Sequence, residues 1–518
     1  MAPLTITQKI LARHLVENGK TPYRNAADGD LPVLKPGTWH EFEVDVTGGS
    51  DVTADGAFAA IEGPDFTDFG EAKIRRLINR NKHRVVVALE HFLGPGADVF
   101  PRSTQANRVR EYARKYGLPH VYDIGVGGIC HIVLPEEGHA RPGDLILWAD
   151  SHTPSYGALG AFAAGVGSTE VGMMILSGRL PFKVPSPVSV ELTGRFRPYV
   201  SSKDAVIHLI GKHYKEGVWR DAAVEYSGEG LSALSLEARI TMANMAAEME
   251  ATTGIFPPDA AVERFVNEEV GRDPDTDRVA VNGKGGRKSK RARAPYRPAL
   301  ADPGAKYGKR IKLDLSTLEP LVAAPYSPDN YAPVSKVAGT EITKAFLGSC
   351  TNARLEDLVI AAEIVAGRKV APGVLMKVVP ASEVVLRQAE NMGVLEKFRK
   401  AGARVADVSS CSWCLGSFFT SEAYAKKYDA KGEVVQADDV VISASNRNFP
   451  NRMGHPEAWI FLASPAVVAA SAVAGAIANP ADVLEEKDLK RALAKYKRFK
   501  RGPGQKFGWE LYGGVRNI

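Results

Sequence analysis

With 518 residues, the chain exceeds the ~250–300 residues at which a single hydrophobic core stops growing, so we expect two to four domains. Its composition, 45% hydrophobic and 24% charged with a net charge of +6, is that of an ordinary soluble globular protein. Four cysteines exclude a disulfide framework in so long a chain, and the opening MAPLTITQKILARHL lacks a signal-peptide pattern, so we expect a cytoplasmic protein.

Along the chain, apolar runs rich in β-branched residues alternate with amphipathic stretches. This pattern predicts an α/β protein whose mainly parallel sheets are covered by helices. The predicted strands are Val85–Leu89, Leu145–Trp148, Thr343–Leu347, Leu375–Val379 and Val440–Ser443, with a weaker one in ARVADV. The predicted helices are Gln105–Tyr116, Leu236–Met249 and Leu355–Ala366.

Two stretches depart from this pattern. Residues 270–312 are rich in Gly, Pro and charge, which predicts a linker or inserted loop between domains. Its basic residues between 284 and 297 are typical of a solvated loop, and the sharper alternatives are nucleic-acid contact or attraction of polyanionic substrates. Residues 481–518 predict a helical, Gly-rich extension with a basic run over 495–501.

The segment Ala458–Pro480 carries no charge and is long enough to cross a bilayer. Pro465 interrupts it, and small residues replace the large apolar ones of a lipid-facing helix. We therefore expect a buried helix over about Pro465–Ile477 and no membrane association.

Polar clusters follow five of the predicted strands directly. Ligands bind at the carboxyl ends of strands in open parallel sheets, so five such clusters together indicate one site, although any one of them alone is explained by a turn or helix cap. The clusters are Glu90-His91, Asp150 to Thr153, Ser349 to Asn352, Ser409 to Cys411 and Ser445 to Asn448.

Further candidates come from a helix and a bend. Asn244 and Glu248 are four residues apart on a predicted buried helix, so they share a face, and a buried carboxylate requires a partner such as histidine. His131 follows the glycine-rich bend Gly127-Gly128. Alone it is typical of a satisfied core histidine, but with His91 and His152 it forms a set of three at strand or turn ends.

Cys411 and Cys414 form a Cys-x-x-Cys pair that several chemistries use. A dithiol switch leaves Cys350 without a role, and a structural zinc site needs a fourth close ligand. Three thiolates would leave one corner of a [4Fe–4S] cubane open, where iron can act as a Lewis acid. Arg447 and Arg452 suit carboxylates, so the set describes removal and addition of water on a hydroxy-diacid.

At this point the chain resembles the aconitase superfamily, over residues of about 5 to 480. In order and spacing it is most similar to the large subunits of isopropylmalate isomerase and homoaconitase. The motifs that carry the resemblance are GICH at 128–131, ADSHT at 149–153, GSCTN at 348–352, CSWCLG at 411–416 and SNRNFPNR at 445–452. It implies three-layer α/β/α domains over 1–195, 196–330 and 331–480, and a swivelling domain that is absent from this chain.

The resemblance also implies roles. Cys350, Cys411 and Cys414 would hold a [4Fe–4S] cluster, and His91, paired with Glu90, would manage the leaving hydroxyl. The implied histidine pairs are His131 with Asp150 and His152 with Glu248. Asn446 would lie near the cluster, Arg447 and Arg452 would hold substrate carboxylates, and the residues implied to complete the pocket are Asp51, Ser151 and Asn244.

Three departures from the family pattern bear on the substrate. Glu90 replaces the usual Asp, Ser50 replaces Gln or His, and Trp413 lies inside the Cys-x-x-Cys pair. The resemblance implies a separate small subunit that supplies a serine base and an arginine, and 3-isopropylmalate as the leading substrate. Homocitrate, alkylmalates or maleate are the alternatives in this branch, and a cluster-loss RNA-binding switch or a catalytically inactive scaffold are alternatives of other classes. Nucleic acid is not an expected partner.

Overall fold

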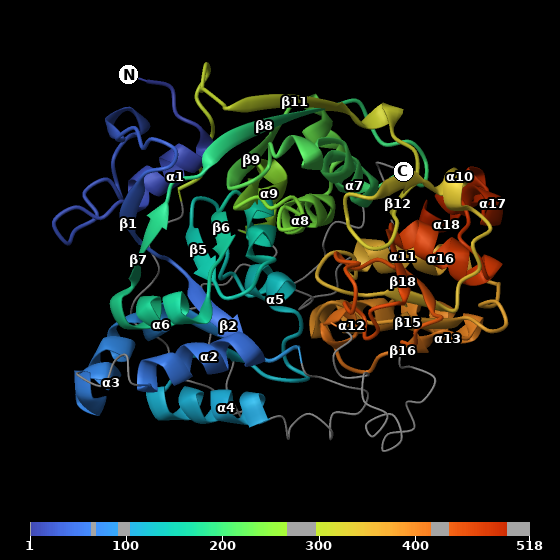
Figure 1. Ribbon diagram of the computed structural model, residues 1–518, viewed down its shortest axis with the longest axis horizontal. Helices are drawn as coiled ribbons and strands as arrows, with labels where there is room; N and C mark the ends of the chain where they lie inside the picture. Colours follow the sequence, from blue (N-terminus) through green and yellow to red (C-terminus); the bar gives the residue numbers. More distant parts are fainter. Residues whose placement is uncertain (1, 64–68, 92–103, 267–296, 416–434, 495–518) are drawn as a thin grey trace.

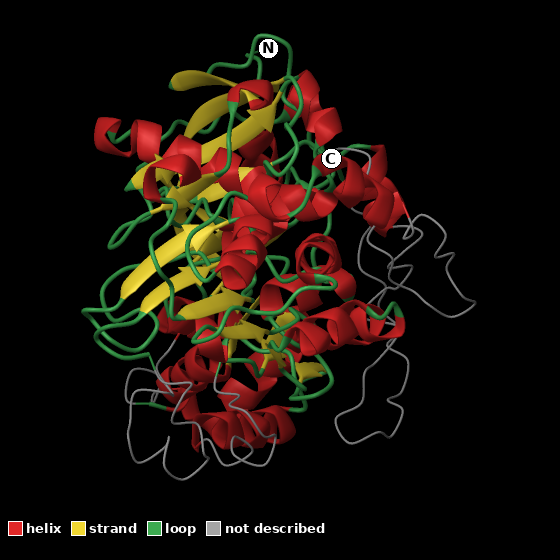
Figure 2. Ribbon diagram, turned by 90° about the vertical axis from the view of Figure 1, so that its right-hand side faces the viewer, coloured by secondary structure: helices red, strands yellow, loops and turns green. Residues whose placement is uncertain are grey.

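The computed structural model describes residues 2–63, 69–91, 104–266, 297–415 and 435–494 (Figure 1). The basic stretch over 284–296 and the run over 495–501 lie outside these residues. Figure 2 shows the strands gathered through the middle of the molecule with helices on both sides of them. The α/β fold predicted from the sequence is therefore confirmed.

The first part of the chain builds a parallel sheet. Strands β2, β3 and β4 pair in that order, β5 pairs with β6, and parallel bridges from Val46 to Ile146 and from Gly49 to Ala149 join the two groups. These strands are β2 (Thr47–Ser50), β3 (Val85–Ala88), β4 (His120–Tyr122), β5 (Leu145–Trp148) and β6 (Phe162–Gly165). An antiparallel pair lies beside them, β1 (Trp39–Glu43) and β7 (Arg179–Lys183).

Helices cover this first sheet. In Figure 1, α2, α3, α4 and α6 lie together at the lower left, and α5 lies toward the middle of the molecule. The helices of this part are α1 (Ile6–His14), α2 (Asp51–Glu62), α3 (Gly70–Asn81), α4 (Thr104–Tyr116), α5 (Cys130–Glu136) and α6 (Ser168–Ser177). A 3-10 helix, η4 (Thr153–Leu159), follows β5 and leads into β6.

The second sheet is parallel throughout, in the order β10-β9-β8-β11. Strands β8 and β11 run side by side across the top of Figure 1, above α7, α8 and α9. Its elements are β8 (Ser186–Thr193), α7 (Ser202–His213), β9 (Ala222–Ser227), α8 (Leu236–Asn244), β10 (Thr253–Ile255), α9 (Ala260–Arg264) and β11 (Lys309–Asp314).

The third sheet, over the described residues, has the order β13-β12-β18-β17-β14-β15-β16. Its pairs are parallel except where β12 meets β13 and β18. The strands are β12 (Leu321–Ala323), β13 (Tyr331–Pro333), β14 (Lys344–Leu347), β15 (Leu375–Val378), β16 (Arg404–Val405), β17 (Val440–Ser443) and β18 (Trp459–Ala463). The helices are α10 (Val334–Val337), α11 (Leu355–Val365), α12 (Glu383–Asn391), α13 (Val394–Ala401), α14 (Ser412–Leu415), α16 (Pro465–Ala474), α17 (Pro480–Val483) and α18 (Glu486–Ala494).

Sheet membership moves the expected domain boundaries. We expected divisions at 195 and 330, but β8 hydrogen-bonds to β9 and β11, and β12 hydrogen-bonds to β18. A division by sheets therefore falls just before Ser186 and between Asp314 and Leu321.

The helix expected over Leu236–Met249 is shorter in the structure. It ends at Asn244, because the Ala246 amide donates to the carbonyl three residues back, at Ala243, and turns continue to Glu250. The expectation that Asn244 and Glu248 share a helical face is therefore wrong.

The uncharged segment near the C-terminus contains the buried helix that the sequence predicted. Ser464 caps α16 by accepting a hydrogen bond from the Val467 amide, Pro465 occupies its first turn, and Gly475 follows with a φ of 79°. Small side chains let the helix pack closely on all sides. No helix in the described part of the chain is long and apolar enough to cross a membrane.

A glycine pair joins the first part of the molecule to the third. Gly128 has a φ of 135°, and a Cβ there would lie 2.5 Å from the Ser382 Cα. The Ile129 amide donates to the Ala381 carbonyl at 2.9 Å, and the Glu383 amide donates to Gly127 at 2.9 Å. Only glycine permits this approach, which places the start of α5 against the third sheet.

Candidate functional site

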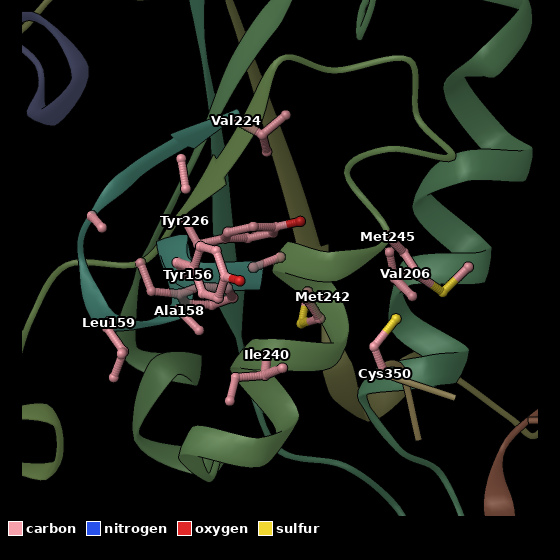
Figure 3. Packing of buried hydrophobic residues seen from close by; sticks show 14 of the residues in the cluster. Tyr156, Ala158, Leu159, Val206, Val224, Tyr226, Ile240, Met242, Met245 and Cys350 are labelled. Atoms are coloured by element: carbon pink, nitrogen blue, oxygen red, sulfur yellow. The ribbon is translucent and has the colours of Figure 1, made fainter. Parts of the chain in front are cut away.

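Three of the four cysteines lie together at the edge of the third sheet. Cys350 follows β14 in a loop whose Ser349 has a left-handed φ of 82°, a strained conformation for a residue with a side chain. Cys411 immediately precedes the short helix α14 (Ser412–Leu415), and Cys414 lies within it. The Cys411 thiol hydrogen-bonds to Cys350. All three are buried, and Figure 3 shows Cys350 beside Met245 and Val206.

The sulfur atoms receive N–H donors. The Asn244 Nδ2 donates to the Cys350 sulfur at 3.1 Å, and the Asn446 Nδ2 lies 3.5 Å from the same atom. The Arg452 Nη2 donates to the Cys414 sulfur at 3.2 Å. Such donors stabilise sulfur that carries negative charge.

The charge of the thiols differs between neighbours. Burial opposes ionisation of Cys350, but the hydrogen bond from Cys411 and the nearby imidazoles of His152 and His131 hold its pKa well below the usual range. The same bond to Cys350, together with burial, raises the pKa of Cys411. The arrangement therefore favours a thiolate at Cys350 with a proton on Cys411.

Asp150, at the end of β5, lies among three histidines. Its Oδ1 is 2.9 Å from the His131 Nε2 and accepts the His152 backbone amide at 2.8 Å. Its Oδ2 is 3.6 Å from the His91 Nε2. Burial opposes the charge, but His131, His152 and His91 hold the pKa of Asp150 well below its usual range, so it is a carboxylate.

His152 connects this group to the second sheet. Its Nε2 lies 2.8 Å from Glu248 Oε1, which also accepts the Arg447 Nε at 2.8 Å. Burial lowers the pKa of His152, but the Glu248 carboxylate, together with Cys350 and Asp150, outweighs burial and raises it to about 10. His152 is consequently an imidazolium, fixed between two carboxylates.

His91, at the end of β3, lies among three carboxylates. Its Nδ1 is 3.3 Å from Asp51 Oδ1 and 3.9 Å from Glu90 Oε1, so Asp51 is nearer than the neighbouring Glu90 that we expected as its partner. Burial lowers the pKa of His91, but Glu90, Asp150 and Asp51 raise it well above its usual value. The ring is therefore protonated.

Glu90 has a role that its sequence position does not reveal. Its Oε2 accepts the Cys130 backbone amide at 3.0 Å, at the first residue of α5. Complete burial raises the pKa of Glu90 to about 7, against the opposing effect of His91 and His131. The longer side chain thus reaches from the end of β3 to the start of α5.

The other predicted residues are placed less centrally. Ser151 is exposed beside Asp150. Ser50 caps α2, with its backbone amide donating to the Thr53 hydroxyl at 2.9 Å. The side chain of Trp413 lies outside the described part of the structure.

The sequence did not point to several residues that hold the site together. The Thr351 hydroxyl accepts a hydrogen bond from Asn446 Nδ2 at 2.9 Å and donates one to Asn244 Oδ1 at 2.8 Å. Lys203, fully buried on α7, donates to the carbonyls of Ala444 and Ser445, immediately before Asn446. Thr351 lies inside a predicted polar cluster, but one lysine in the first turn of a helix gave no such signal.

The cysteine and histidine groups form one centre. Ligand atoms of His131, His152 and Cys350 all lie within 4.8 Å of one another, so this buried group could hold a metal. Four buried polar atoms around it have no hydrogen-bond partner among the described residues: Glu90 Oε1, His131 Nδ1, Glu248 Oε2 and Arg452 Nε. Buried polar atoms of this kind usually have a water, an ion or a ligand group as partner. Three convergent thiols with N–H donors and open polar partners nearby fit an anionic metal–sulfur group.

The family profile and the relatives that match this chain point to one family. The profile of the aconitase family (aconitate hydratase) matches residues 82–341 and 335–475. A 3-isopropylmalate dehydratase large subunit from Moorella thermoacetica is 38% identical over 482 residues, which cover 93% of this chain and 100% of the relative. One from Aquifex aeolicus is 37% identical over 492 residues (94% and 99%), and one from Methanopyrus kandleri is 40% identical over 397 residues (77% and 85%).

Proposed function

Because this chain belongs to the aconitase family, we propose that it is the large subunit of a hydro-lyase that removes and re-adds water on 3-isopropylmalate. The observation that carries the proposal is that three buried cysteines lie together and that the Cys350 sulfur lies within 4.8 Å of ligand nitrogens of His131 and His152. The names of the relatives supply the substrate.

Cys350, Cys411 and Cys414 are the residues that would hold a [4Fe–4S] cluster in this centre. The N–H donors from Asn244, Asn446 and Arg452 support this assignment, because they offset negative charge on the sulfurs. When bound, such a cluster supplies a Lewis-acidic iron at the corner that no cysteine occupies.

Substrate binding falls to the two arginines. Arg447 directs its Nε toward Glu248, so the edge formed by its two terminal nitrogens is the one we assign to a substrate carboxylate. Arg452 directs one terminal nitrogen to Cys414 and has a buried, unpaired Nε, so it would receive a second carboxylate close to the sulfurs. Two carboxylates held in this way orient a diacid.

Proton handling falls to the histidines. The protonated His91, held by Asp51 and Asp150, would donate to the leaving hydroxyl as its bond to carbon breaks. The charged His152 would attract the hydroxyl or carboxyl oxygens of the diacid, while Glu248 fixes its ring. Asp150 fixes His131 through Nε2 and leaves the unpaired Nδ1 to meet substrate or water.

The base that removes the carbon-bound proton would come from a partner chain. The relatives are named as large subunits, which supports a small-subunit partner for this chain as well. We assign to that partner the serine base and a further arginine implied by the family resemblance. Isolated, this chain would bind the cluster but turn over substrate poorly.

Anaerobic cluster reconstitution with a co-expressed small subunit, followed by turnover of a panel of malate derivatives, tests this function. We expect 3-isopropylmalate to give the highest kcat/KM, ahead of homocitrate, methylmalate and maleate. A higher kcat/KM for one of these compounds would identify that compound as the substrate and leave the proposed reaction unchanged. A cluster-loaded complex that dehydrates none of these malate derivatives would refute the proposed function.

A further inference from the structure

A cavity lies between the first turns of α7, α8, α11 and α16. Its volume is about 70 Å³, and its walls include Phe196, Glu237, Asn352, Glu356, Ile360 and Leu489. Glu237 lies at the start of α8, whereas Asn244, which contacts Cys350, ends that helix. At 1.5 Å per residue the two are about 10 Å apart along the helix, so the Glu237 side of the cavity lies away from Cys350. The opposite wall includes Asn352, two residues after Cys350.

The polar part of the cavity has few donors. Asn352 Oδ1 is buried and has no hydrogen-bond partner among the described residues. The buried carboxyl groups of Glu237 and Glu356 hydrogen-bond to each other, and Ser235 hydrogen-bonds to Glu356. Glu237 is only 4% exposed and Asn352 only 2% exposed. An unpaired acceptor at this depth costs free energy unless a ligand supplies a donor.

The contact between the two carboxyl groups affects their protonation. Burial and the neighbouring Glu356 raise the pKa of Glu237, and burial raises the pKa of Glu356. At least one of the two therefore holds a proton when the cavity is empty. The charge of the nearby Arg354 lowers both pKa values but leaves them raised. Its guanidinium donates to the carbonyls of Cys350 and Thr351 and to the Thr241 hydroxyl.

The other wall of the cavity is apolar. Phe196, Val200, Ile360 and Leu489 line it, so the ligand must combine a donor-rich cationic head with a hydrocarbon part. Two carboxyl groups repel an anion. A divalent metal ion would require more oxygen ligands and retained water, which the apolar wall does not accommodate.

We propose that this cavity binds a small primary alkylammonium ion, with its three N–H donors on Glu237, Glu356 and Asn352 and its alkyl group on the apolar wall. The occupied site touches the segment that carries Cys350. Asn352 Nδ2 donates to Asp357 Oδ1 at 2.9 Å and to the Thr241 hydroxyl at 3.2 Å, and that hydroxyl donates to the Thr351 carbonyl at 2.9 Å.

Saturation-transfer NMR on the full chain, with isobutylammonium as the probe, tests this site. Isobutanol and isobutyrate match the probe in shape but lack its charge or reverse it. We expect saturable binding of the ammonium ion alone, weakened about tenfold or more by Glu237→Gln, which is the loss of about 1.4 kcal/mol of binding free energy. Glu229→Gln, an exposed residue shortly before α8, makes the same change in net charge and should leave binding unaltered.

Glu356→Gln provides a second variant, should Glu237→Gln fail to fold by circular dichroism. Binding that both variants leave unchanged would overturn the assignment. So would equal binding of isobutanol or isobutyrate, no binding of the ammonium ion at all, or displacement of the ammonium ion by MgCl2 at matched ionic strength.

Discussion

Asp150 is the residue on which the three histidines of the site converge. The sequence motif paired it with His131 alone, yet its two oxygens also contact His152 and His91. A motif fixes which residue types follow a strand but not how loops from β3 and β5 face each other. The contacts of Asp150 with His152 and His91 were therefore not predictable from the spacing of these residues in the sequence.

Replacing Asp150 with Asn should separate its catalytic contribution from its structural one. The amide keeps an acceptor for His131 but removes the negative charge that holds His91 and His131 in place, so we expect kcat to fall about 100-fold. Cluster absorbance should not change, because the sulfurs take their hydrogen bonds from Asn244, Asn446 and Arg452. A variant that retains more than a tenth of wild-type kcat would contradict this role.

Lys203 predicts a distinct pH dependence of stability. Complete burial lowers its pKa from 10.5 to about 8, so between these values the unfolded chain binds a proton that the native chain does not. The free energy of unfolding contributed by this group should therefore rise with pH across that window, by about 3 kcal/mol.

Urea unfolding of wild type and Lys203→Met at pH 7.5 and pH 10 measures this effect. The variant lacks the group, so wild-type stability should increase relative to the variant at the higher pH. Because Lys203 also holds the carbonyls of Ala444 and Ser445, turnover of the variant should fall at both pH values. Parallel pH profiles for the two proteins would show that burial does not lower the pKa of Lys203.

At the scale of elements, buried parallel strands were predicted closely and helix ends were not. Leu145–Trp148 and Val440–Ser443 match β5 and β17 residue for residue, because continuous apolar runs identify strands covered on both faces. The helix through Glu248 was extended too far, because the apolar pattern continues past the point where hydrogen bonding changes at Ala246. Periodicity records burial rather than backbone hydrogen bonds.

The junction at Gly128 gives a prediction at this scale. In Gly128→Ala the new Cβ would lie 2.5 Å from the Ser382 Cα and 2.8 Å from the Ala381 carbonyl oxygen, at a φ of 135°. The two segments must separate, so we expect a loss of about 2–3 kcal/mol in unfolding free energy and reduced turnover. Denaturant unfolding measures the first effect.

Gly125→Ala is the matched control in the same loop. Its φ is 74° and a Cβ there meets nothing within 4 Å, so only conformational strain of about 1 kcal/mol should appear. Equal losses of unfolding free energy in the two variants would mean that the close approach to Ser382 does not cause the destabilisation of Gly128→Ala.

At the scale of the whole molecule, the site is assembled from loops of different sheets. Loops that follow β3, β5, β14, β16 and β17 supply many of its residues, and the carboxyl-end rule for parallel strands predicted these loops. The remaining residues come from the starts of α2 and α5 and from the end of α8 and the turns after it. The sequence did not predict that β8 and β12 belong to the second and third sheets, because strand pairing depends on partners far along the chain. It also could not reveal Lys203, which connects α7 to the loop after β17.

The proposed partner gives a prediction at this scale. Turnover of 3-isopropylmalate by the reconstituted chain alone should rise at least about 100-fold when a small subunit is added, because the partner brings the catalytic base. Kinetic titration of one chain with the other measures this rise. Full activity of the isolated chain would show that the base lies within these 518 residues.

The most direct test of the cluster ligands is iron–sulfur absorbance after anaerobic reconstitution of four single cysteine variants. We expect Cys350→Ala, Cys411→Ala and Cys414→Ala each to lose the cluster, since their side chains lie together in one buried centre. Cys130→Ala, the matched control, should retain it, because the Cys130 thiol hydrogen-bonds to Glu90, whereas the thiols of Cys350 and Cys411 hydrogen-bond to each other. A full cluster in Cys350→Ala would show that Cys350 is not a cluster ligand.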